Sequence, residues 1–410
     1  MPIIAPASII RHGRLHRAPA WASALKIVGI AVAVIAVSAV SVGSIAVWDL
    51  AHNIKPGVHL IGETQGPPPA IGDYEGGFNV LVAASDSGGG DIQTYGKRGE
   101  HLNDVTMLIH VSGNHQYATV ISFPRDLQVQ IASCPDGKGG NYGTQTTKIN
   151  VALTYGGLPC IVKTVENLTG LDIPYAALTE FQGVVGMSNA VGGVTVCVAT
   201  AIHDEQIGFD LDAGQQTLVG GQAVQFLRVR YGLGDGSDLG RVSNQQLFLS
   251  ALVRKVKTPE VLGNPITDYQ LAQAITSNMT LSDSLTNLNT LVAMAGAVKD
   301  IDFNNVVFVQ YPNGSSAQGP VPNVAAAKVL IDAIKADQPI QLTGKPSGVG
   351  GTVLDTSAPV VTGNGSTATP TPGASTAAPD TGDGTAVSLP SDVYGQTAAQ
   401  TTCTKGQRAG

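Results

Sequence analysis

The chain has 410 residues and carries 23 Lys and Arg against 30 Asp and Glu, which gives a formal net charge of −7. This acidic balance, with no basic tract in the globular region, argues against a nucleic-acid partner. The 8 His are scattered, and neither a Ser-His-Asp order nor a GxSxG elbow is present. The sequence therefore has no acyl-transfer or protease signature, and a site must be sought where the sparse charges, 13% of all residues, gather.

The N-terminal segment is basic and is followed by a long apolar stretch. Residues 1–26 form a basic tail without acids, and residues 27–48 (IVGIAVAVIAVSAVSVGSIAVW) carry no charge. A helix over this stretch reaches about 33 Å, enough for a bilayer core. We favour a retained transmembrane helix over a cleaved signal peptide, because the run is longer than a usual signal core. The positive-inside rule then predicts a cytoplasmic N-terminus and an extracytoplasmic remainder.

Composition divides the rest of the chain into three parts. Residues 49–76 are punctuated by Gly and Pro and are expected to form an extracytoplasmic spacer. Residues 77–344 are expected to form the globular domain. Residues 345–410 are dominated by Ser, Thr, Gly, Pro and Ala. Because such a composition cannot bury a core, we predict a disordered tail there.

Strand-like and helix-like stretches alternate through the globular domain, which predicts an α/β sandwich with a mixed sheet. The first strand is mostly apolar (FNVLVAA), as in a strand covered on both faces, and the turn SGNH joins the next two in a hairpin. The predicted strands are residues 78–84, 105–112, 117–123, 175–178, 194–199 and 306–311. The predicted helices are residues 149–155, 158–169 with Gly170 as the stop, 181–191, 268–276, 282–299 and 324–336.

On this topology the cysteines lie outside the cytoplasm, where disulfides persist. No CxxC pair is present, so their spacing does not indicate a zinc site. Cys134 and Cys160 flank a Gly-rich segment, and we predict that they pair. Cys197, in the apolar run VTVCVAT, is either a buried free thiol or the partner of Cys403.

Charged residues concentrate in the stretch FLRVRYGLGDGSDLGRVSNQQ. It contains Arg228, Arg230, Asp235, Asp238 and Arg241. The part before the loop is a helix or a strand that ends at the first two arginines. If it is extended, their spacing of two residues places both side chains on one face.

A helix is predicted after this loop, because apolar residues recur with a helical period from residue 239 to residue 256. Ser237 or Asp238 is a suitable N-cap. Arg241 and Gln245 then lie on one face near the positive end of the helix. Guanidiniums beside a helix N-terminus suit an anion with several oxygens, best a phosphate or pyrophosphate. The alternative is a surface loop with satisfied salt bridges.

Three further loops contribute candidate residues. Asp86 follows the first strand, and Asp104 immediately precedes the second. Two carboxylates from separate loops, with phosphate oxygens, are ligands that Mg²⁺ prefers, although a lone Asp in such a loop is more often a turn residue. Arg125 and Asp126 follow the hairpin, and Lys148 lies in a KIN sequence. Arg125 and Lys148 add positive charge for a diphosphate.

These motifs, taken in order, resemble the LytR–CpsA–Psr family in its actinobacterial form. The resemblance covers about residues 78–257 and rests on NVLVAASDS, LNDVTMLIHVS, VISFPRD, KIN, TYGG, TVENLTGLDIPY, AVGGVTV and FLRVRYGLGDGSDLGR. It implies an αβα sandwich around a central mixed sheet, preceded by one transmembrane helix, with a groove for a polyprenyl chain and Mg²⁺ at the pyrophosphate. It also implies a membrane-anchored phosphotransferase that moves a phosphoglycan from a polyprenyl-pyrophosphate carrier to a muramic acid 6-hydroxyl of peptidoglycan.

The resemblance also implies which residues of this sequence occupy the functional positions of the family. Asp86 and Asp104 match the Asp of its GxDxR and RSDT motifs, which serve Mg²⁺ and the pyrophosphate. Arg125 and Asp126 match its PRD motif, Lys148 its KIN motif as a substrate-binding residue, Arg228 and Arg230 its RxR pair, Asp238 and Arg241 its DxGR piece, and Gln245 the Gln of its closing RQ.

The sequence also departs from the family pattern. Gly88, Leu102 and Asn244 stand where the family has Arg. Fewer cations therefore surround the diphosphate, which affects the expected rate and donor preference more than the class of enzyme. Arg98 or Lys97, in the loop between the two aspartates, is a candidate replacement.

The resemblance implies that arginines and Mg²⁺ stabilise the charge that develops on the phosphates, with Asp86 or Asp104 as the candidate base. Two alternatives remain. One is an extracellular polyprenyl-pyrophosphate pyrophosphatase with water as acceptor. The other is a non-catalytic protein that binds an anionic polymer or a prenyl phosphate. The acids beside the cations disfavour the second, because simple anion capture does not need them.

Overall fold

The computed structural model describes residues 20–63, 74–85, 101–234, 236, 238–344, 352–355, 360–361, 367–368 and 386–407. The chain separates into two compact units, Met1–His52 and Asn53–Gly410. Most of the described part of the first unit is helix α1 (Ala20–Asn53), which has 34 residues.

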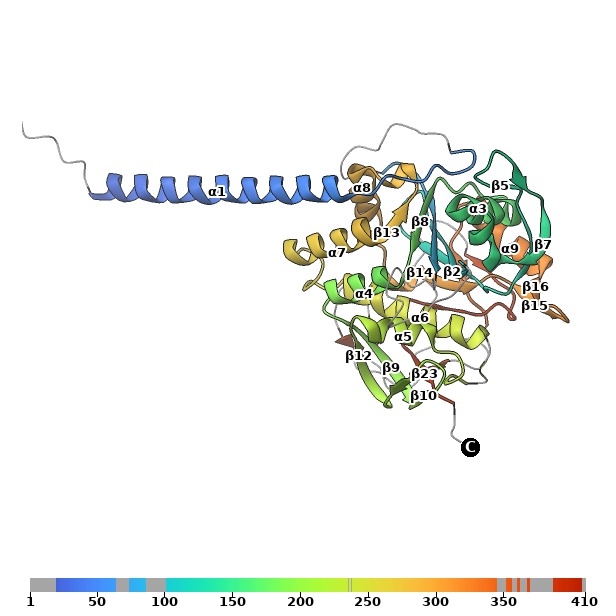
Figure 1. Cartoon of the computed structure of the whole chain (residues 1–410). Helices are drawn as coiled ribbons and strands as arrows, with labels where there is room; N and C mark the ends of the chain where they lie inside the picture. Colours follow the sequence, from blue (N-terminus) through green and yellow to red (C-terminus); the bar gives the residue numbers. More distant parts are fainter. Residues whose placement is uncertain are drawn as a thin grey trace, which may run out of the picture. The chain divides into compact units, whose positions relative to one another are not determined.

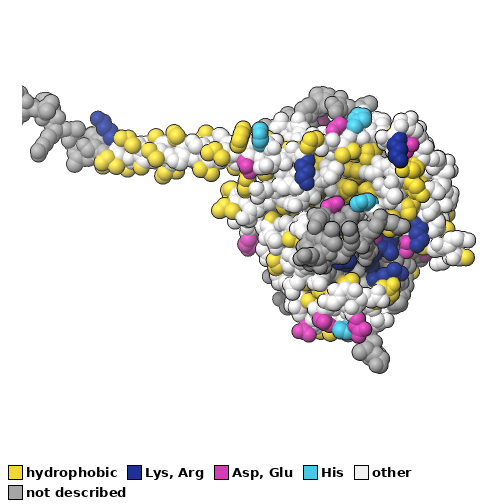
Figure 2. Space-filling view, in the orientation of Figure 1, with side chains coloured by type: hydrophobic (Ala, Val, Ile, Leu, Met, Phe, Trp, Pro, Cys, Tyr) yellow, Lys and Arg dark blue, Asp and Glu magenta, His cyan; other side chains and the backbone are white. Residues whose placement is uncertain are grey.

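Helix α1 is long and apolar enough to cross a membrane. The most apolar 18-residue window within Ala24–Asn53 has a mean hydropathy of 2.5 and is not buried at all. Hydrophobic side chains lie along its length (Figure 2). At about 1.5 Å per residue the helix is about 50 Å long. It therefore contains the apolar helix that was predicted over residues 27–48.

The described part of the second unit is built on a central sheet of seven strands, in the order β13-β8-β1-β2-β3-β14-β22 (Figure 1). β1 pairs antiparallel with β2 and parallel with β8, and β3 pairs antiparallel with β2 and parallel with β14, so the sheet is mixed, as predicted. The strands are β13 (Met279–Leu281), β8 (Tyr175–Thr179), β1 (Phe78–Ser85), β2 (Asn103–Val111), β3 (Ala118–Phe123), β14 (Val306–Gln310) and β22 (Gly395–Thr397).

Helices pack on both faces of this sheet, which confirms the αβα sandwich. α3 and α9 lie on one face, and α6 and α8 lie on the other with α4 and α7 beside them (Figure 1). The helices are α3 (Ala152–Thr169), α4 (Phe181–Ala190), α5 (Gly221–Arg228), α6 (Asp238–Val256), α7 (Pro265–Asn278), α8 (Leu288–Lys299) and α9 (Val324–Lys335).

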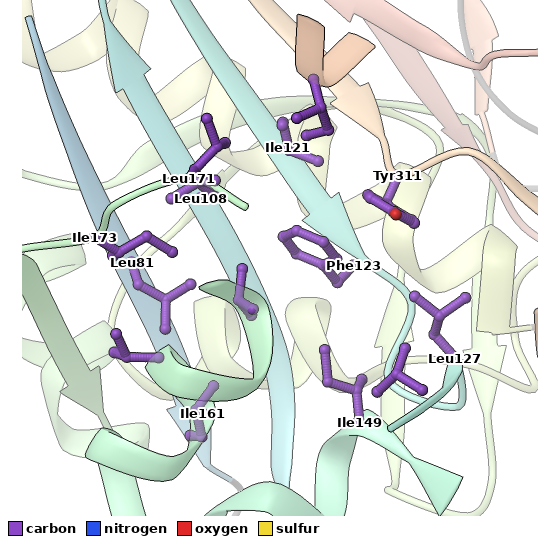
Figure 3. Close-up of a cluster of buried hydrophobic side chains, with 14 of the residues drawn as sticks. Leu81, Leu108, Ile121, Phe123, Leu127, Ile149, Ile161, Leu171, Ile173 and Tyr311 are labelled. Atoms are coloured by element: carbon purple, nitrogen blue, oxygen red, sulfur yellow. The ribbon is translucent and has the colours of Figure 1, made fainter. Parts of the chain in front are cut away.

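The hydrophobic core follows the period-2 alternation of strands. In β1, Leu81 and Ala83 join the core under α3 and α9, whereas Phe78 joins the core on the opposite face. Leu81, Leu108 and Ile121 come from three adjacent strands and are each 0% exposed (Figure 3). The sheet is therefore covered on both faces, which explains why its first strand reads as a nearly continuous apolar run.

A smaller four-stranded sheet, in the order β12-β9-β23-β18, packs against α5 and α6 around a third core. Its strands are β12 (Gly214–Leu218), β9 (Val194–Thr200), β23 (Thr402–Lys405) and β18 (Thr352–Leu354). Shorter pieces complete the described fold: β4 (Gln128–Ile131), β5 (Cys134–Pro135), β6 (Asn141–Tyr142), β7 (Gln145–Lys148), β10 (Ile202–Asp204), β11 (Phe209–Leu211), β15 (Asn313–Ser316), β16 (Gly319–Pro322), β17 (Ile340–Gln341), β19 (Val360–Val361), β20 (Thr367–Ala368), β21 (Val387–Ser388) and the 3₁₀ helices η1 (Ile149–Val151), η2 (Asp283–Leu285) and η3 (Phe303–Asn305).

The prediction of a disordered tail from residue 345 onward is wrong for residues 386–407. β22 pairs with β14 at the edge of the central sheet, and β23 lies between two strands of the smaller sheet. Leu389 is 1% exposed and Cys403 is 5% exposed. Composition concealed this segment because its small and polar residues are held mainly by backbone pairing with strands far away in the sequence. The predicted spacer also takes part in the fold, since Leu60 is 2% exposed.

Two helices differ from their predicted extents because of local caps. α7 begins at Pro265 rather than at residue 268, since the Asn264 side chain accepts the Ile266 amide and Pro suits the first helical position. The helix predicted over residues 282–299 is divided into η2 and α8. Asn287 interrupts it and caps α8 through its side chain.

Two disulfides join the described cysteines. Cys134 in β5 is bonded to Cys160 in α3, which confirms the predicted pair. Cys197 in β9 is bonded to Cys403 in β23, so the second of the two alternatives for Cys197 holds. The first bond fastens the loop region after β4 onto α3, and the second fastens the C-terminal segment onto the body.

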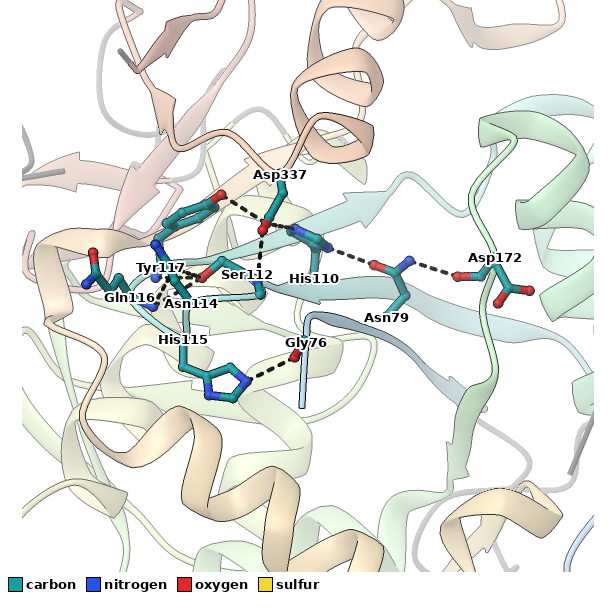
Figure 4. Close-up of polar contacts among 11 residues, drawn as sticks. Gly76, Asn79, His110, Ser112, Asn114, His115, Gln116, Tyr117, Asp172 and Asp337 are labelled. Atoms are coloured by element: carbon teal, nitrogen blue, oxygen red, sulfur yellow. Dashed lines mark hydrogen bonds and ion pairs between the residues drawn. The ribbon is translucent and has the colours of Figure 1, made fainter. Parts of the chain in front are cut away.

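A polar network ties the end of α9 to the β2–β3 hairpin (Figure 4). The Asp337 carboxylate accepts hydrogen bonds from the Gly113 amide and the Tyr117 hydroxyl, each at 2.9 Å. His110 Nε2 lies 3.4 Å from Asp337 Oδ1, and its Nδ1 lies 2.9 Å from Asn79 Oδ1. Burial lowers the pKa of His110 below its ordinary value, with Asp337 opposing that shift.

This lowered pKa predicts how stability depends on pH. The unfolded chain binds a proton at His110 more readily than the folded chain does, so stability is full above pH 6.5 and falls as the pH drops toward the folded-state pKa. Urea unfolding of the second unit between pH 7.5 and 5.5 should show this fall, and His110→Gln should flatten it. The exposed His101→Gln variant is the matched control and should keep the wild-type slope. If His110→Gln also keeps that slope, another group causes it.

Candidate active site

Three parallel strands of the central sheet, β1, β3 and β8, end at one edge, and a cavity of about 300 Å³ opens there. Ser85 lies at the end of β1, Arg125 shortly after β3 and Glu180 directly after β8. The edge beyond the carboxyl ends of parallel strands is where α/β proteins commonly place their sites. We call this cavity the arginine pocket, because the charged side chains in the described part of its lining are those of Asp104, Arg125, Glu180, Asp204, Arg228, Arg230 and Arg241.

Asp104 holds two of the guanidiniums. Arg125 Nη1 donates a hydrogen bond to Asp104 Oδ1, and Arg241 Nη1 lies 3.8 Å from the same oxygen. The side chains of Asp104 and Arg241 are 15% and 8% exposed. Charges interact more strongly in such a partly desolvated place than on the open surface. The structure thus brings together three residues that the sequence named as site candidates, and the pairing of Asp104 with Arg125 and Arg241 orients two cations at the wall of the pocket.

Arg228 and Arg230 both line the pocket, although they do not lie on an extended segment. Arg228 is the last residue of α5, and Val229 after it has extended dihedral angles and is buried. The Arg228 guanidinium lies 4.8 Å from the centre of the Phe181 ring. Arg230 Nε donates to the Gly236 carbonyl at 3.1 Å. A helix end followed by one extended residue thus turns both side chains toward the same cavity.

Asp204 supports the loop that carries Arg230, and the sequence did not single it out. Its Oδ2 accepts the backbone amides of Arg230, Tyr231 and Gly232, at 3.2, 3.1 and 3.3 Å. Its Oδ1 accepts the Gln206 amide at 3.1 Å. Asp204 is only 2% exposed. Asp204 therefore fixes the backbone of this loop, which brings β10 beside residues 230–232.

Asp126 and Lys148 are not among the described residues that line the pocket. The Lys148 ammonium is 2.9 Å from Asp126 Oδ1, and Arg125 Nε is 3.9 Å from the same oxygen. The Lys148 side chain is 47% exposed. Asp126 thus pairs with Arg125, one of the guanidiniums of the pocket, and Lys148 neutralises Asp126.

Gln245 lines the pocket one helical turn after Arg241, as the predicted helix face requires. Its Nε2 donates to the Leu227 carbonyl at 3.3 Å, and Asn244 Nδ2 donates to the Phe226 carbonyl at 2.7 Å. Asn244 stands where the resembling family has Arg, and here it ties α6 to the end of α5. The two amides thus hold the two helices that carry the arginines.

Several predicted site residues lie outside the described residues: Asp86 and Arg98, and with them Ser237 and the side chain of Asp238. Glu180, by contrast, lines the pocket and was not predicted. No local motif marks it, since it is a single acid between a strand and a helix. A hint was available from the general expectation that residues directly after strands of an α/β sheet carry function.

The pocket can bind and polarise a substrate with several anionic oxygens. Among the described residues, four guanidiniums line it with three carboxylates, and the carboxylate of Asp204 is engaged by backbone amides. Lys and Arg side chains gather in one area of this unit's surface (Figure 2). A cavity of about 340 Å³ between α4 and α7 differs, because its described lining has amides such as Asn189 and Gln273 and no charged side chain. Anion chemistry is therefore expected in the arginine pocket.

The pocket offers Mg²⁺ oxygen ligands of the kind that this ion requires. Asp104 presents a carboxylate in the pocket lining, which is a suitable hard ligand, and Mg²⁺ at phosphates takes its other ligands largely from phosphate and water. Among the described residues, two groups of three side chains of metal-ligating types lie close together outside the pocket: His59, Glu63 and Asp283, and Cys197, Asp355 and Cys403, of which the second is excluded as a metal site because its two cysteines form a disulfide. The residues present fit the ion through Asp104, and Mg²⁺ stays a prediction.

A family model described as the LytR_cpsA_psr family matches residues 55–334. Among curated proteins, the probable cell wall biosynthesis protein LcpB of Corynebacterium glutamicum is 30% identical over 270 residues, which cover 63% of this chain and 61% of that protein. The cell wall biosynthesis protein LcpA of the same organism is 28% identical over 235 residues, 53% of this chain and 44% of LcpA. The chain thus spans less than two thirds of these two relatives.

A further relative is the polyisoprenyl-teichoic acid–peptidoglycan teichoic acid transferase TagU of Enterococcus faecalis, 27% identical over 57% of this chain and 72% of that protein. Among solved structures, protein gbs0355 from Streptococcus agalactiae superposes with a TM-score of 0.52 at 19% identity, over 64% of this chain and 88% of that one. The LytR-Csp2A-Psr enzyme from Actinomyces oris superposes with a TM-score of 0.50 at 20% identity, over 68% and 96%. These structural likenesses show a shared fold.

Proposed function

The chain belongs to the LytR–CpsA–Psr family, and from this premise we propose that it is a membrane-anchored phosphotransferase. Its donor is a glycan on a polyprenyl pyrophosphate, and its acceptor is peptidoglycan in the assembling cell wall. The observation that carries the proposal is the convergence of Arg125, Arg228, Arg230 and Arg241 on one cavity at the strand ends. The names of the relatives LcpB and TagU, a cell wall biosynthesis protein and a teichoic acid transferase, support the substrate class.

The chemistry follows from where charge develops. Cleavage of the pyrophosphate linkage places negative charge on the leaving polyprenyl phosphate and on the oxygens of the transferred phosphoryl group. Guanidiniums that are already oriented, as Arg125 is by Asp104, stabilise that charge without reorganisation during the reaction. When bound, Mg²⁺ would neutralise further charge on the phosphates, with Asp104 and Asp86 as its protein ligands.

Incubating the full chain in lipid vesicles with a polyprenyl-pyrophosphate-linked glycan, Mg²⁺ and a muropeptide acceptor tests the proposal. The expected products are a glycan-phosphate-muropeptide and free polyprenyl phosphate in equal amounts. Polyprenyl phosphate without the muropeptide product would instead support the pyrophosphatase alternative. Binding of the donor without either product would leave the non-catalytic alternative.

The Mg²⁺ proposal gives its own prediction. Asp104→Ala removes a proposed ligand and should raise the Mg²⁺ concentration needed for half-maximal turnover. Titrating the metal against turnover in wild type and variant checks this. Asp126→Ala is the matched control, because Asp126 contacts Arg125 from outside the pocket lining, and it should change the maximal rate more than the metal requirement. An unchanged metal requirement in Asp104→Ala contradicts the assignment of this ligand.

We also propose that the second unit lies outside the cytoplasm. The basic residues before α1 support this orientation by the positive-inside rule. A phosphatase reporter that folds only outside the cytoplasm should be active when fused after Gly344. Replacing the four basic residues before residue 27 by Gln should lower the reporter signal. Activity of a cytoplasm-only reporter at the same fusion point contradicts the orientation.

A further inference from the structure

The C-terminal segment reaches the loop that carries Arg230. Strand β23 lies between β9 and β18, and its Cys403 is disulfide-bonded to Cys197 of β9. Directly after β23, Gly406 forms an antiparallel bridge with Leu233. Leu233 is 1% exposed. The last described residues of the chain thus lie against the turn that follows Arg230.

Two backbone hydrogen bonds flank this bridge. The Gly234 amide donates to the Lys405 carbonyl at 3.0 Å, and the Gln407 amide donates to the Gly232 carbonyl at 2.8 Å. Backbone groups at such a buried place need partners, because an unsatisfied one is costly. The C-terminal segment supplies these partners to residues 232–234.

Gly406 is held on its other side by the end of β9. Its amide donates to the Thr200 carbonyl at 3.2 Å, and its own carbonyl accepts the Thr200 hydroxyl at 3.1 Å. A Cβ atom at this position would lie 1.9 Å from the carbonyl oxygen of Ala201. A side chain at residue 406 would therefore force the segment away from β9 and disturb its pairing with Leu233.

The turn that carries Arg230 is thus held from both ends. Asp204 accepts the amides at its start, and the Leu233 amide donates to the Arg230 carbonyl at 3.1 Å to close it. The C-terminal segment secures its end. A guanidinium can act on a developing charge only if its backbone keeps it within a fraction of an ångström of the right place.

We infer that the backbone of Lys405–Gln407 is a positioning element for the arginine pocket. It holds the turn after Arg230 so that this guanidinium faces the substrate phosphates, and Gly406 is required because no side chain fits between β9 and the turn. The expected effect on turnover rests on the proposed function. The expected effect on the conformation of the turn after Arg230 rests on the contacts alone.

Three variants of the full chain test this in lipid vesicles. Gly406→Val should lower turnover about a hundredfold, the scale expected for a misplaced catalytic group. Truncation after Thr404 keeps Cys403 and both disulfides while it removes the bridge and the carbonyl that accepts the Gly234 amide, and it should lower turnover similarly. Gly314→Val is the matched control, because a Cβ there meets nothing within 4 Å, and it should keep wild-type turnover.

A double-variant cycle identifies the route of the effect. On an Arg230→Ala background, Gly406→Val should lower turnover by less than about twofold further, because the group that it positions is gone. On an Arg228→Ala background it should lower turnover by nearly its full factor, because α5 has no contact with the C-terminal bridge among the hydrogen bonds described above. Equal losses on both backgrounds would overturn the inference and indicate general destabilisation.

Hydrogen exchange gives a readout that does not depend on activity. The amide of Gly234 should exchange at least tenfold faster in the truncated protein than in wild type, while amides of β1 and β2 keep their rates. Unchanged exchange at Gly234 overturns the inference even if the wild-type protein proves to have no transferase activity. If wild type is inactive and exchange still rises in the truncated protein, the positioning contact stands and the proposed function fails.

Discussion

Arg228→Ala and Arg230→Ala are each expected to lower turnover about a hundredfold or more, the cost of removing one preorganised donor from a developing negative charge. Each removes a guanidinium that lines the pocket. Steady-state rates with the polyprenyl-pyrophosphate donor check the prediction. Lys at either position should recover only part of the rate, because an ammonium cannot reproduce the planar fork of donors.

The controls separate catalysis from folding. Melting temperatures of both Ala variants should stay near wild type, since the stacking of Arg228 on Phe181 contributes only about 1 kcal/mol. Lys328→Ala removes a cation of α9 whose side chain is 72% exposed, and it should keep full turnover. If the Arg variants unfold, or stay folded and fully active, the two arginines serve as structural ion-pair residues.

Asp204→Ala is expected to be among the most destabilising single changes in the second unit. Asp204 is 2% exposed, and the substitution removes a carboxylate that accepts hydrogen bonds from four backbone amides. Leaving buried donors without a partner costs about 1–3 kcal/mol each, so a loss of about 3 kcal/mol or more in the free energy of unfolding is expected. Urea unfolding at pH 7.5 measures it.

Asp204→Asn should be milder, because its carbonyl can still accept the amides of the Arg230 loop while its NH₂ group faces the Gln206 amide. Asp210→Ala is the matched control on the neighbouring strand β11. Its side chain is 75% exposed, and its loss should leave the unfolding midpoint unchanged. Equal stability of Asp204→Ala and wild type would mean that water replaces the carboxylate and that the loop does not depend on it.

The strands β1, β2, β3, β8 and β14 of the central sheet were predictable because they are largely buried and contain apolar runs, whereas the three-residue strands β13 and β22 were not predicted. The hairpin of β2 and β3 and the stop of α3 at Gly170 were also local, since a short turn and a left-handed glycine specify them. In the smaller sheet β9 was predicted as a strand, but its partner β23 was not. The pairing joins segments about 200 residues apart through backbone hydrogen bonds, which leave no mark in the sequence that would identify the partner.

In the site, too, some residues could be predicted from the local sequence and others could not. Asp104, Arg125 and Arg241 were found because charged residues stand beside strand and helix ends in a chain with few charges. Asp204 was missed because its role depends on a loop that only the fold brings beside it. Of the two alternatives for the segment before the arginine loop, the helix holds, since α5 ends at Arg228, and both Arg228 and Arg230 line the pocket.

The pairing of Cys197 with Cys403 also has a consequence for biosynthesis. The partners are separated by 206 positions, whereas Cys134 and Cys160 are separated by 26. At a synthesis rate of about 5–20 residues per second, Cys403 appears about 10–40 s after Cys197. Throughout that interval Cys134 and Cys160 can form their disulfide. Cys197 remains a thiol, because β23, which pairs with its strand β9, has not yet been synthesised. The order of emergence therefore favours the correct pairs, and a nascent chain stopped before residue 403 should carry one disulfide and one reactive thiol.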